Sequence, residues 1–408
     1  MSYQITAPLQ PITARLKLPS SKSISNRALI LNALSNSPYQ VENLSNCDDT
    51  QVTIAAFQPN THRIDIHAAG TAMRFLTAYF SVQEGERTIT GTPRMQQRPI
   101  RLLVDALRSL GANIEYLNNE GFPPLKINGQ KLTGGTLTLE GNVSSQYISA
   151  LLMIAPYMEK GLSLTLSGEI ISKPYIEMTI QLMREYGVST DWDENIIRIA
   201  PQRYTPTAFH VESDWSAASY WYEIASLIPN SVFELSGLKN PSTQGDARIA
   251  EFFKPLGVET QYTETGIRLT HTDIRKNEIN LDLTNQPDLA QTLVVTCALL
   301  NIPFSFTGLQ SLKIKETDRI TALKTELSKL GYVITDKNNS VLEWGGQRKS
   351  PETAPDIDTY DDHRMAMAFA PAAMLFPGLI INHPEVVSKS YPDFWNDLRQ
   401  CGFSINEV

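Results

Sequence analysis

Residues 18–34, LPSSKSISNRALILNAL, join an extended segment to a helix. The second half of the stretch carries apolar residues at helical spacing, which predicts a helix that faces a core. Ser23 or Ser25 is the expected N-cap. Free backbone N–H groups and the positive end of the helix dipole would then lie beside Lys22, Arg27 and several hydroxyls, which predicts an anion-binding site. An ordinary capped helix with surface cations is the alternative.

The composition bounds the size and the partners of the protein. A chain of 408 residues exceeds what one hydrophobic core usually serves, so we expect two domains. With 35 basic and 43 acidic residues the net charge is −8, which argues against a nucleic acid or an anionic membrane as partner. A local group of cations would then be directed at a small ligand.

The cysteines and histidines suggest neither disulfides nor a metal. Cys47, Cys297 and Cys401 are far apart, and the six histidines show no ligand spacing, so we expect no metal. The N-terminus has no apolar leader segment, and the apolar stretch at 365–376 is shorter than a membrane span. These features predict a cytoplasmic protein.

One local pattern recurs along the chain: an amphipathic helix ends at a glycine, and a strand follows. Successive glycines of this kind lie 70 to 76 residues apart, at Gly111, Gly187, Gly257, Gly331 and Gly402. Glycine suits the left-handed conformation that closes a helix, and a near-constant period indicates a repeated unit. A sixth, degenerate copy without the glycine is expected near residues 48–66.

Six mixed units predict an α/β (α+β) fold of two pseudo-symmetric domains with three units each. The chain should cross between the domains at 19–21 and at 210–219. One domain would then comprise residues 1–18 and 214–408, and the other residues 19–213. We expect ligands in the cleft between domains.

Polar helix starts gather in the first half of the chain. In HAAGTAMRFLTAYF, residues 67–80, Gly70 permits close backbone approach and Thr71 could cap the helix. Arg98 follows on a loop, where its planar fork suits phosphate or carboxylate, although loop arginines are usually only solvated. Two further apolar helices begin at hydroxyl or amide side chains, namely Ser144, Ser145 and Gln146, and then Ser172 and Tyr175. Together they predict a surface for a hydroxylated, anionic small molecule.

The second half places acids beside cations. Asp288 begins an almost wholly apolar helix, where the alternative is a favourable first-turn acid. A polar run before another helix holds Lys315, Glu316 and Arg319, for which a surface ion-pair ladder is the alternative. Arg364 precedes a helix too apolar to be exposed, so it should lie at the rim of something buried. Lys389 lies on a loop before the final helix.

Eight motifs carry a family resemblance over about residues 5–405. In chain order they are LPSSKSISNRAL, AGTAMR, PRMQQRPI, VSSQYISALLM, ISKPYIEMT, KETDR, DHRMAMAFA and SKSYPDF. Their set and order resemble the 5-enolpyruvylshikimate-3-phosphate synthase family. The resemblance implies two domains of three βαβαββ units each, arranged as an inside-out α/β barrel. It also implies transfer of the enolpyruvyl group of phosphoenolpyruvate to the 5-hydroxyl of shikimate 3-phosphate, with release of phosphate, in the shikimate pathway to chorismate and aromatic amino acids. Two small-molecule substrates, no cofactor and a monomer are implied as well.

The resemblance also implies the ligand sets. For shikimate 3-phosphate they are Ser23, Arg27, Ser144, Ser145, Gln146, Ser172, Asp288 and Lys315. For phosphoenolpyruvate they are Lys22, Gly70, Arg98, Gln146, Arg319, Arg364 and Lys389.

The expected chemistry is addition followed by elimination. Two anionic substrates repel each other, so fixed cations have to offset that repulsion, and domain closure can assemble them. We expect Asp288 to be the base at the 5-hydroxyl and Glu316 the proton donor and acceptor at C3. Lys22 would stabilise charge and help phosphate to leave.

The chain departs from the family pattern at a few positions. The family usually has glycine where this chain has Ser20, asparagine at Ala68, and proline at Phe75. Phe75 adds bulk and frees φ just behind the expected phosphoenolpyruvate loop. Asparagine is also usual at Ser311 and at Asp361.

Two other functions fit the same pattern. The first is the related enolpyruvyl transfer to UDP-N-acetylglucosamine, whose enzymes typically carry a cysteine in the loop that corresponds to residues 84–98; this chain has none there. The second is a catalytically silent anion-binding protein. It would be expected to have lost Lys22, Asp288 or Glu316, and all three are present.

Overall fold

The chain forms two compact units in a computed structural model that describes residues 1–59 and 61–408. Unit 1 comprises Met1–Pro19 and Glu212–Val408, and unit 2 comprises Ser20–Val211. The boundaries expected from the sequence were 18/19 and 213/214.

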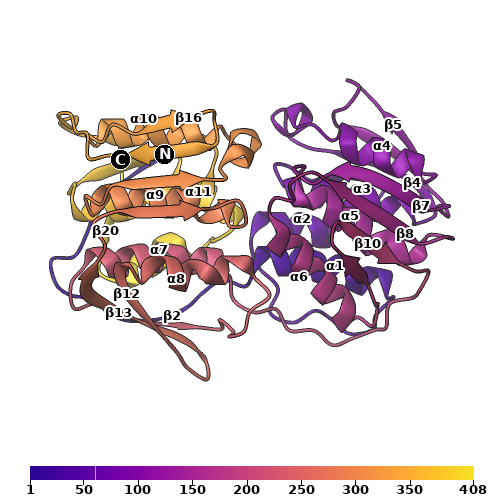
Figure 1. Cartoon of the computed structure of the whole chain (residues 1–408), viewed down its shortest axis with the longest axis horizontal. Coiled ribbons are helices and arrows are strands. Elements are labelled where there is room, and N and C mark those ends of the chain that lie inside the picture. Colours follow the sequence, from indigo (N-terminus) through magenta and orange to yellow (C-terminus); the bar gives the residue numbers. More distant parts are fainter. Residues whose placement is uncertain (60) are drawn as a thin grey trace. The chain divides into compact units, whose positions relative to one another are not determined.

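Unit 1 contains six helices and three four-stranded sheets within the described residues (Figure 1). The helices are α7 (Trp215–Leu227), α8 (Ile249–Phe253), α9 (Ala290–Leu299), α10 (Arg319–Lys329), α11 (His363–Phe369) and α12 (Phe394–Gln400). The first sheet has the order β12 (Leu256–Tyr262), β13 (Gly266–Arg275), β11 (Val232–Ser236), β2 (Thr13–Lys17). The second has the order β14 (Ile279–Asp282), β15 (Phe304–Thr307), β17 (Val341–Trp344), β16 (Thr335–Lys337). The third has the order β18 (Asp356–Ile357), β19 (Leu379–Asn382), β1 (Ser2–Thr6), β20 (Ser404–Glu407).

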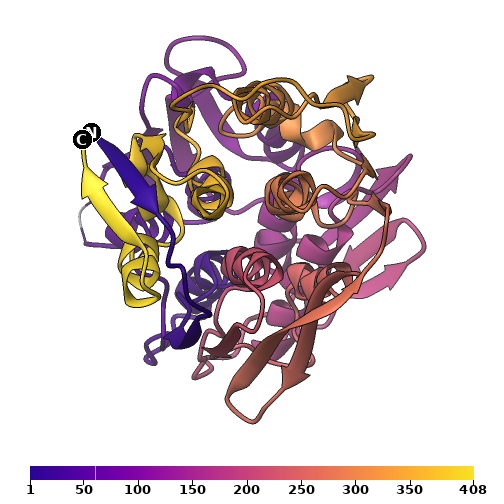
Figure 2. The same cartoon turned by 90° about the vertical axis from the view of Figure 1, so that its left-hand side faces the viewer.

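The helices α7, α9 and α11 form the inside of unit 1. Every residue of α9 and of α11 is buried, which is the pattern of a helix surrounded by apolar neighbours on all sides. Figure 2 looks along these three helices and shows the sheets around them. Buried and less buried residues alternate in β11, β17 and β19, one strand of each sheet, so one face of these strands is turned to the core. The N-terminal strand β1 pairs with the C-terminal strand β20, which brings the two ends of the chain side by side (Figure 2).

Unit 2 contains six helices and two four-stranded sheets within the described residues. The helices are α1 (Lys22–Leu34), α2 (Asp48–Ala56), α3 (Gly70–Ser81), α4 (Arg101–Ser109), α5 (Ser145–Ile154) and α6 (Lys173–Glu185). One sheet has the order β3 (Arg63–Asp65), β4 (Gly85–Thr90), β6 (Leu125–Gly129), β5 (Asn113–Tyr116). The other has the order β7 (Gly135–Glu140), β8 (Leu162–Ser167), β10 (Ile196–Ile199), β9 (Asp191–Asp193). All residues of α5 except Gln146 are buried.

The five sheets share one topology, which explains the sequence period. In each sheet a parallel pair is followed by two antiparallel neighbours, as in β3, β4, β6 and β5. The chain order there is β3-α3-β4-α4-β5-β6, which is the expected βαβαββ unit. The expected sixth copy is less complete. In the segment expected to hold it, 48–66, α2 is followed by β3, which belongs to the sheet of the next unit. Apart from an isolated parallel bridge between Glu42 and His210, the described residues form no separate sheet for this copy. Residue 60, within the segment expected to hold this copy, lies outside the described residues.

Four of the five periodic glycines close helices as predicted: Gly111, Gly187, Gly331 and Gly402 directly follow the C-cap residues of α4, α6, α10 and α12. Gly257 does not, because α8 ends at Phe253 and Gly257 is the second residue of β12. All five have φ angles between 82° and 107°. At Gly331 a Cβ atom would also come within 2.7 Å of the carbonyl oxygen of Lys349. Glycine is therefore required there by conformation and by space.

Candidate active site

Seven charged side chains gather around the N-terminal ends of α9, α10 and α11 in unit 1. We call them the unit 1 charge cluster: Asp288, Lys315, Glu316, Arg319, Asp362, Arg364 and Lys389. Sequence analysis predicted roles for six of them, and the structure brings those six together. The seventh, Asp362, was noticed only as part of a motif.

Arg319 is the centre of the unit 1 charge cluster. The residue is 1% exposed, and its guanidinium donates hydrogen bonds to three carboxylates. Nε lies 2.7 Å from Asp362 Oδ2, Nη1 lies 3.2 Å from Asp288 Oδ1, and Nη2 lies 3.1 Å from Glu316 Oε2. Burial alone would lower the pKa of Arg319, but the three carboxylates raise it above its usual value. The Arg319 guanidinium therefore fixes both predicted proton-transfer residues.

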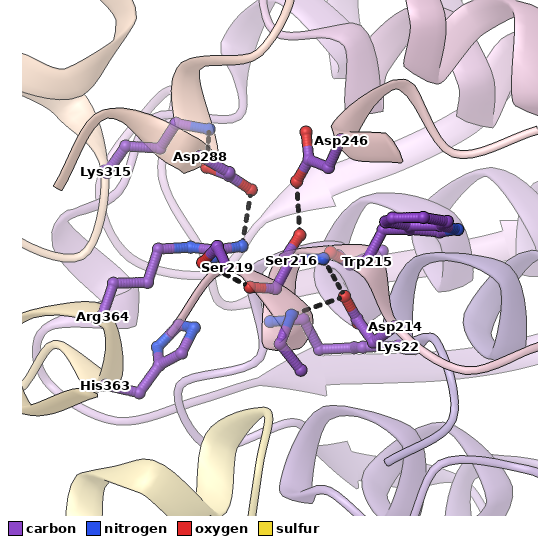
Figure 3. Close-up of polar contacts among 12 residues, drawn as sticks. Lys22, Asp214, Trp215, Ser216, Ser219, Asp246, Asp288, Lys315, His363 and Arg364 are labelled. Carbon is purple, nitrogen blue, oxygen red and sulfur yellow. Dashed lines mark hydrogen bonds and ion pairs between the residues drawn. The ribbon is translucent and has the colours of Figure 1, made fainter. Parts of the chain in front are cut away.

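Asp288 lies among three cations. Besides Arg319, it accepts a hydrogen bond from Arg364 Nη2 at 2.9 Å and lies 3.5 Å from Lys315 Nζ. Figure 3 shows the Arg364 and Lys315 side chains reaching this carboxylate. Burial tends to raise the pKa of Asp288, but the charges of Arg364, Lys315 and Arg319 hold it well below the usual range. Asp288 is therefore ionised at neutral pH.

Glu316 has a different pair of partners. One oxygen accepts from Arg319, and the other lies 3.2 Å from Lys389 Nζ. Lys389 was expected on a loop before the final helix, but it is the last residue of a 3₁₀ helix, Pro384–Lys389, and is largely buried. The Glu316 carboxylate is thus held between two cations at the start of α10.

Asp362 connects the unit 1 charge cluster to the fold. Its carboxylate is fully buried and caps α11 by accepting a hydrogen bond from the backbone N–H of Arg364 at 2.9 Å. The preceding residues, Tyr360 and Asp361, have φ angles of 53° and 55°, so the chain turns sharply just before the cap. Arg364 was expected before this helix but is its second residue, and at 7% exposed it lies at the edge of a buried element, as predicted.

Asp246 is an acid near this cluster that sequence reasoning missed. It lies on the 3₁₀ helix Gly245–Arg248, is buried, and accepts a hydrogen bond from the Ser216 hydroxyl at the start of α7 (Figure 3). Burial, assisted by the negative charge of Asp288, raises the pKa of Asp246 to about 7. Asp214 caps α7 by accepting a hydrogen bond from the backbone N–H of Ser216 at 2.8 Å. The only sequence signal for Asp246 is its position in the first turn of a short helix, which is a weak signal.

The helix that begins at Lys22 is capped differently from the prediction. Ser21 is the N-cap of α1, and its hydroxyl accepts from the backbone N–H of Ile24 at 3.4 Å. Ser23 and Ser25 lie inside the helix, so their prediction as caps was wrong. Three nearby serines offered the same side-chain chemistry, and the backbone conformation after Pro19 decides which one caps. Lys22 Nζ lies 3.9 Å from the buried carboxylate of Asp49, a partner on α2 that sequence reasoning missed.

Arg27 is enclosed in unit 2. Nε donates to Thr179 Oγ1 at 2.7 Å and Nη2 donates to Ser149 Oγ at 3.2 Å, so α1 is joined to α5 and α6. Two carbonyl oxygens, those of Ser23 and Tyr175, accept further hydrogen bonds at 2.9 and 3.3 Å. Burial lowers the pKa of Arg27 to about 10, so the side chain remains charged at neutral pH.

Gly70, Arg98 and Gln146 come together at the starts of α3 and α5. A Cβ atom on Gly70 would lie 2.7 Å from Arg98 Nη1, so the absence of a side chain lets the guanidinium approach the helix start. Gln146 Nε2 donates to the Thr71 hydroxyl at 3.1 Å. Thr71 was expected to cap α3, but that helix begins at Gly70 with Ala69 as N-cap and without a side-chain cap bond. Because glycine can adopt the first helical position, the helix starts one residue before Thr71.

The remaining predicted residues of unit 2 also stand at helix starts. Ser144 caps α5 by accepting from the backbone N–H of Gln146 at 3.3 Å, as expected, and Ser145 is the first helical residue. Ser172 is the N-cap residue of α6 with a left-handed φ of 54° and makes no side-chain cap bond. Its hydroxyl is therefore not used by the helix that it precedes.

Residues 1–59 and 61–408 hold neither a metal site nor a membrane span. No group of three or more His, Cys, Asp and Glu side chains in these residues has the geometry to hold a metal ion. None of the helices there is both long and apolar enough to cross a bilayer.

Comparison with known proteins places the chain in a family. The family model described as EPSP synthase (3-phosphoshikimate 1-carboxyvinyltransferase) matches residues 6–59 and 54–398. A 3-phosphoshikimate 1-carboxyvinyltransferase of Bacteroides fragilis is 61% identical over 407 residues, which cover 99% of both chains. The enzyme of the same name from Shewanella halifaxensis is 34% identical and aligns with 96% of this chain and 97% of its own length.

A solved structure has the same fold. The EPSP synthase of Acinetobacter baumannii is superposed with a TM-score of 0.77 over the full length of both chains, at 21% sequence identity. At that identity the structural likeness supports the fold alone, whereas the family model and the sequence relatives cover nearly the whole chain. The chain belongs to the EPSP synthase (3-phosphoshikimate 1-carboxyvinyltransferase) family.

Proposed function

We propose how the residues of this chain divide the work of its family's reaction. The chain transfers the enolpyruvyl group of phosphoenolpyruvate to the 5-hydroxyl of shikimate 3-phosphate and releases phosphate, a step of the shikimate pathway to aromatic amino acids. Binding of the two anionic substrates and the transfer of protons between them fall to different groups of side chains.

The proposed ligands of phosphoenolpyruvate come from both units. They are Lys22, Gly70, Arg98 and Gln146 in unit 2, and Arg319, Arg364 and Lys389 in unit 1. The unit 1 charge cluster supports this proposal because it holds four cations and three carboxylates, within a protein of net charge −8. A local positive charge in an acidic protein favours an anionic substrate. In unit 2, the approach of Arg98 to Gly70 adds a guanidinium at a helix N-terminus, a favourable position for a phosphate or carboxylate group.

The proposed ligands of shikimate 3-phosphate are mostly hydroxyls and amides at helix starts. They are Ser23, Arg27, Ser144, Ser145, Gln146 and Ser172 in unit 2, with Asp288 and Lys315 in unit 1. The hydroxyl of Ser172, which makes no cap bond to α6, and the fixed guanidinium of Arg27 support this proposal. Such groups suit a substrate that carries both a phosphate and ring hydroxyls.

Proton transfer is assigned to Asp288 and Glu316, with Lys22 as the third catalytic residue. Asp288 is kept ionised, as a base for the 5-hydroxyl must be. While oxygen O5 attacks C2 of phosphoenolpyruvate, Asp288 takes the hydroxyl proton and Glu316 gives a proton to C3. In the elimination, the C2–O bond to phosphate breaks, Glu316 takes a proton back from C3, and the proton held by Asp288 passes to the released phosphate. Lys22 stabilises the charge on the departing phosphate.

One observation carries this assignment. Asp288 and Glu316 are both bonded to the same buried guanidinium, Arg319, and each has a further cation of its own. Because Arg319 fixes both carboxylates, Asp288 can take the hydroxyl proton and Glu316 can protonate C3 while the distance between the two acids stays constant. A surface ion-pair ladder, the alternative interpretation, would leave Arg319 exposed.

An acceptor assay tests the reaction and its rival together. The protein is mixed with phosphoenolpyruvate and either shikimate 3-phosphate or UDP-N-acetylglucosamine, and phosphate release is measured. We expect release with shikimate 3-phosphate only. Release with UDP-N-acetylglucosamine would favour the related transferase, and binding of both substrates without release would favour a silent anion-binding protein.

The proposal includes a cytoplasmic monomer. Cys47, Cys297 and Cys401 are buried free thiols, which suits a reducing compartment. Sedimentation of the purified protein would test the oligomeric state, and a mass of about twice the 45.5 kDa of one chain would contradict a monomer.

A further inference from the structure

Arg27 carries a charge that no carboxylate balances within the described residues. The residue is 2% exposed, and every acceptor of its hydrogen bonds is neutral: two hydroxyls and two backbone carbonyls. The ion pairs of the described residues include none to Arg27. A buried cation without a counter-ion is costly unless some other group stabilises it.

The ring of Phe75 lies against this cation. Phe75 stands on α3, is 1% exposed, and has its ring centroid 5.2 Å from Arg27 Cζ. That distance is within the range in which the negative face of an aromatic ring attracts a guanidinium, and the attraction is larger in a site that water does not reach. Phe75 therefore stabilises a cation that has no carboxylate partner among the described residues.

A ring and a carboxylate differ in what they leave for a ligand. A carboxylate would cancel the charge of Arg27, whereas a ring stabilises the cation without removing net positive charge. The four hydrogen bonds of Arg27 also use four of the five N–H donors of a guanidinium, so one hydrogen on Nη1 has no acceptor among the described residues. Arg27 is thus held in place and still has charge and a donor to offer an anion.

We propose that Phe75 is a positioning residue in the binding of shikimate 3-phosphate. The Phe75 ring holds the Arg27 guanidinium charged and oriented toward the substrate. This inference rests on the proposed function, in which Arg27 binds shikimate 3-phosphate. Phe75 itself does not contact the substrate. Its loss should weaken binding of shikimate 3-phosphate and leave phosphoenolpyruvate and the chemical step nearly unaffected.

The test compares Phe75→Leu with Phe75→Tyr. Leucine keeps an apolar side chain but removes the aromatic face, whereas tyrosine keeps the face. For Phe75→Leu we expect the KM for shikimate 3-phosphate to rise about 10-fold, which corresponds to about 1.4 kcal/mol. The KM for phosphoenolpyruvate and kcat should change less than about 2-fold, and Phe75→Tyr should restore the wild-type KM. Equal losses in both variants, or equal effects on both substrates, would overturn the inference.

A second measurement covers the possibility that Phe75→Leu does not fold. Incorporating 3,4,5-trifluorophenylalanine at position 75 withdraws electron density from the ring face while nearly preserving its shape. We expect a rise in the KM for shikimate 3-phosphate at unchanged melting temperature. An unchanged KM in this variant would also overturn the inference.

Arg27→Gln separates this inference from the proposed function. If Arg27→Gln leaves the affinity for shikimate 3-phosphate intact, the assignment of Arg27 as a ligand is wrong, and the role of Phe75 falls with it. If Arg27→Gln weakens binding but neither ring variant does, the assignment stands and only the role of Phe75 is wrong. In an Arg27→Gln background, Phe75→Leu should add less than about 2-fold, because the interaction is already lost.

Discussion

Replacing Asp288 by asparagine removes one negative charge from the unit 1 charge cluster at nearly constant shape. The carboxylate accepts hydrogen bonds from Arg319 at 3.2 Å and Arg364 at 2.9 Å, and it lies 3.5 Å from Lys315 Nζ. Asparagine keeps one oxygen acceptor, but its amide N–H groups would face cations. We expect Asp288→Asn to be less stable, to bind phosphoenolpyruvate at least as tightly, and to lose turnover.

The size of each effect of Asp288→Asn can be worked out from the surroundings of the carboxylate. Breaking a buried ion pair costs about 3–5 kcal/mol, and because the side chain is 19% exposed and asparagine keeps one acceptor, we expect about 2–3 kcal/mol. In a unit of about 200 residues this lowers the melting temperature by about 4–12 °C. Loss of a general base lowers kcat by about 10²–10⁴-fold. Removing an anion beside the cations should leave affinity for phosphoenolpyruvate unchanged or up to about 10-fold tighter.

The assays for Asp288→Asn are thermal unfolding, phosphate release, and equilibrium binding of phosphoenolpyruvate in the presence of shikimate 3-phosphate. Asp336→Asn is a matched control, because Asp336 also pairs with a cation in unit 1, Lys324, and its side chain is 24% exposed. Asp336→Asn should leave kinetics unchanged. Near-normal turnover in Asp288→Asn would remove Asp288 as the base. Binding of phosphoenolpyruvate weakened more than about 10-fold would refute the argument from charge.

Three further predictions concern the cap of α1, the buried acid and a helix-closing glycine. Ser21→Ala should lower the free energy of unfolding by about 1 kcal/mol in urea titrations. Ser23→Ala should leave the free energy of unfolding within about 0.5 kcal/mol of wild type and raise the KM for shikimate 3-phosphate. The reverse pattern would contradict the observed cap. The pKa of Asp246 is raised to about 7, so its contribution to stability is complete below about pH 4 and is lost as the pH rises through about 7. Asp246→Asn should therefore flatten the fall in unfolding free energy between those pH values, and an unchanged pH profile would show that Asp246 is not the titrating group. Gly331→Ala should lower the free energy of unfolding by about 1–3 kcal/mol, because alanine at a φ of 88° is strained and meets a carbonyl oxygen; a variant as stable as wild type would refute this.

The repeat could be predicted from sequence because its signal is local. All five periodic glycines have a positive φ, a conformation that favours glycine, so their spacing from Gly111 to Gly402 revealed five copies of one unit. The incomplete sixth copy lacks that glycine, and no local pattern indicates how much of its sheet forms. The bridge between Glu42 and His210 joins residues far apart in the chain, so the pairing depends on the folded unit rather than on either segment alone.

The sequence indicated most residues of the candidate site, but few of the contacts between them. Charged motifs indicated Asp288, Glu316 and Arg319, but not that one buried guanidinium would bond to both acids. The sequence did not indicate that Asp362 binds Arg319, because these two residues are 43 positions apart and come into contact only in the folded chain. Phe75 was noticed as a departure from the family, yet its position over Arg27 depends on the packing of α3 against α1.

In the proposed mechanism, Glu316 exchanges protons with C3 while Asp288 acts at the hydroxyl. Turnover in D₂O tests it most directly, because protonation of C3 and later loss of a proton leave deuterium in the enolpyruvyl methylene of the product. Wild-type protein and a Glu343→Gln control, whose carboxylate pairs with Lys337 on the β16–β17 hairpin, should both incorporate deuterium at the rate of turnover. Glu316→Gln should lose turnover and incorporation together by about 10²–10⁴-fold, with affinity for shikimate 3-phosphate retained. Incorporation by Glu316→Gln at the wild-type rate would contradict the assignment of Glu316.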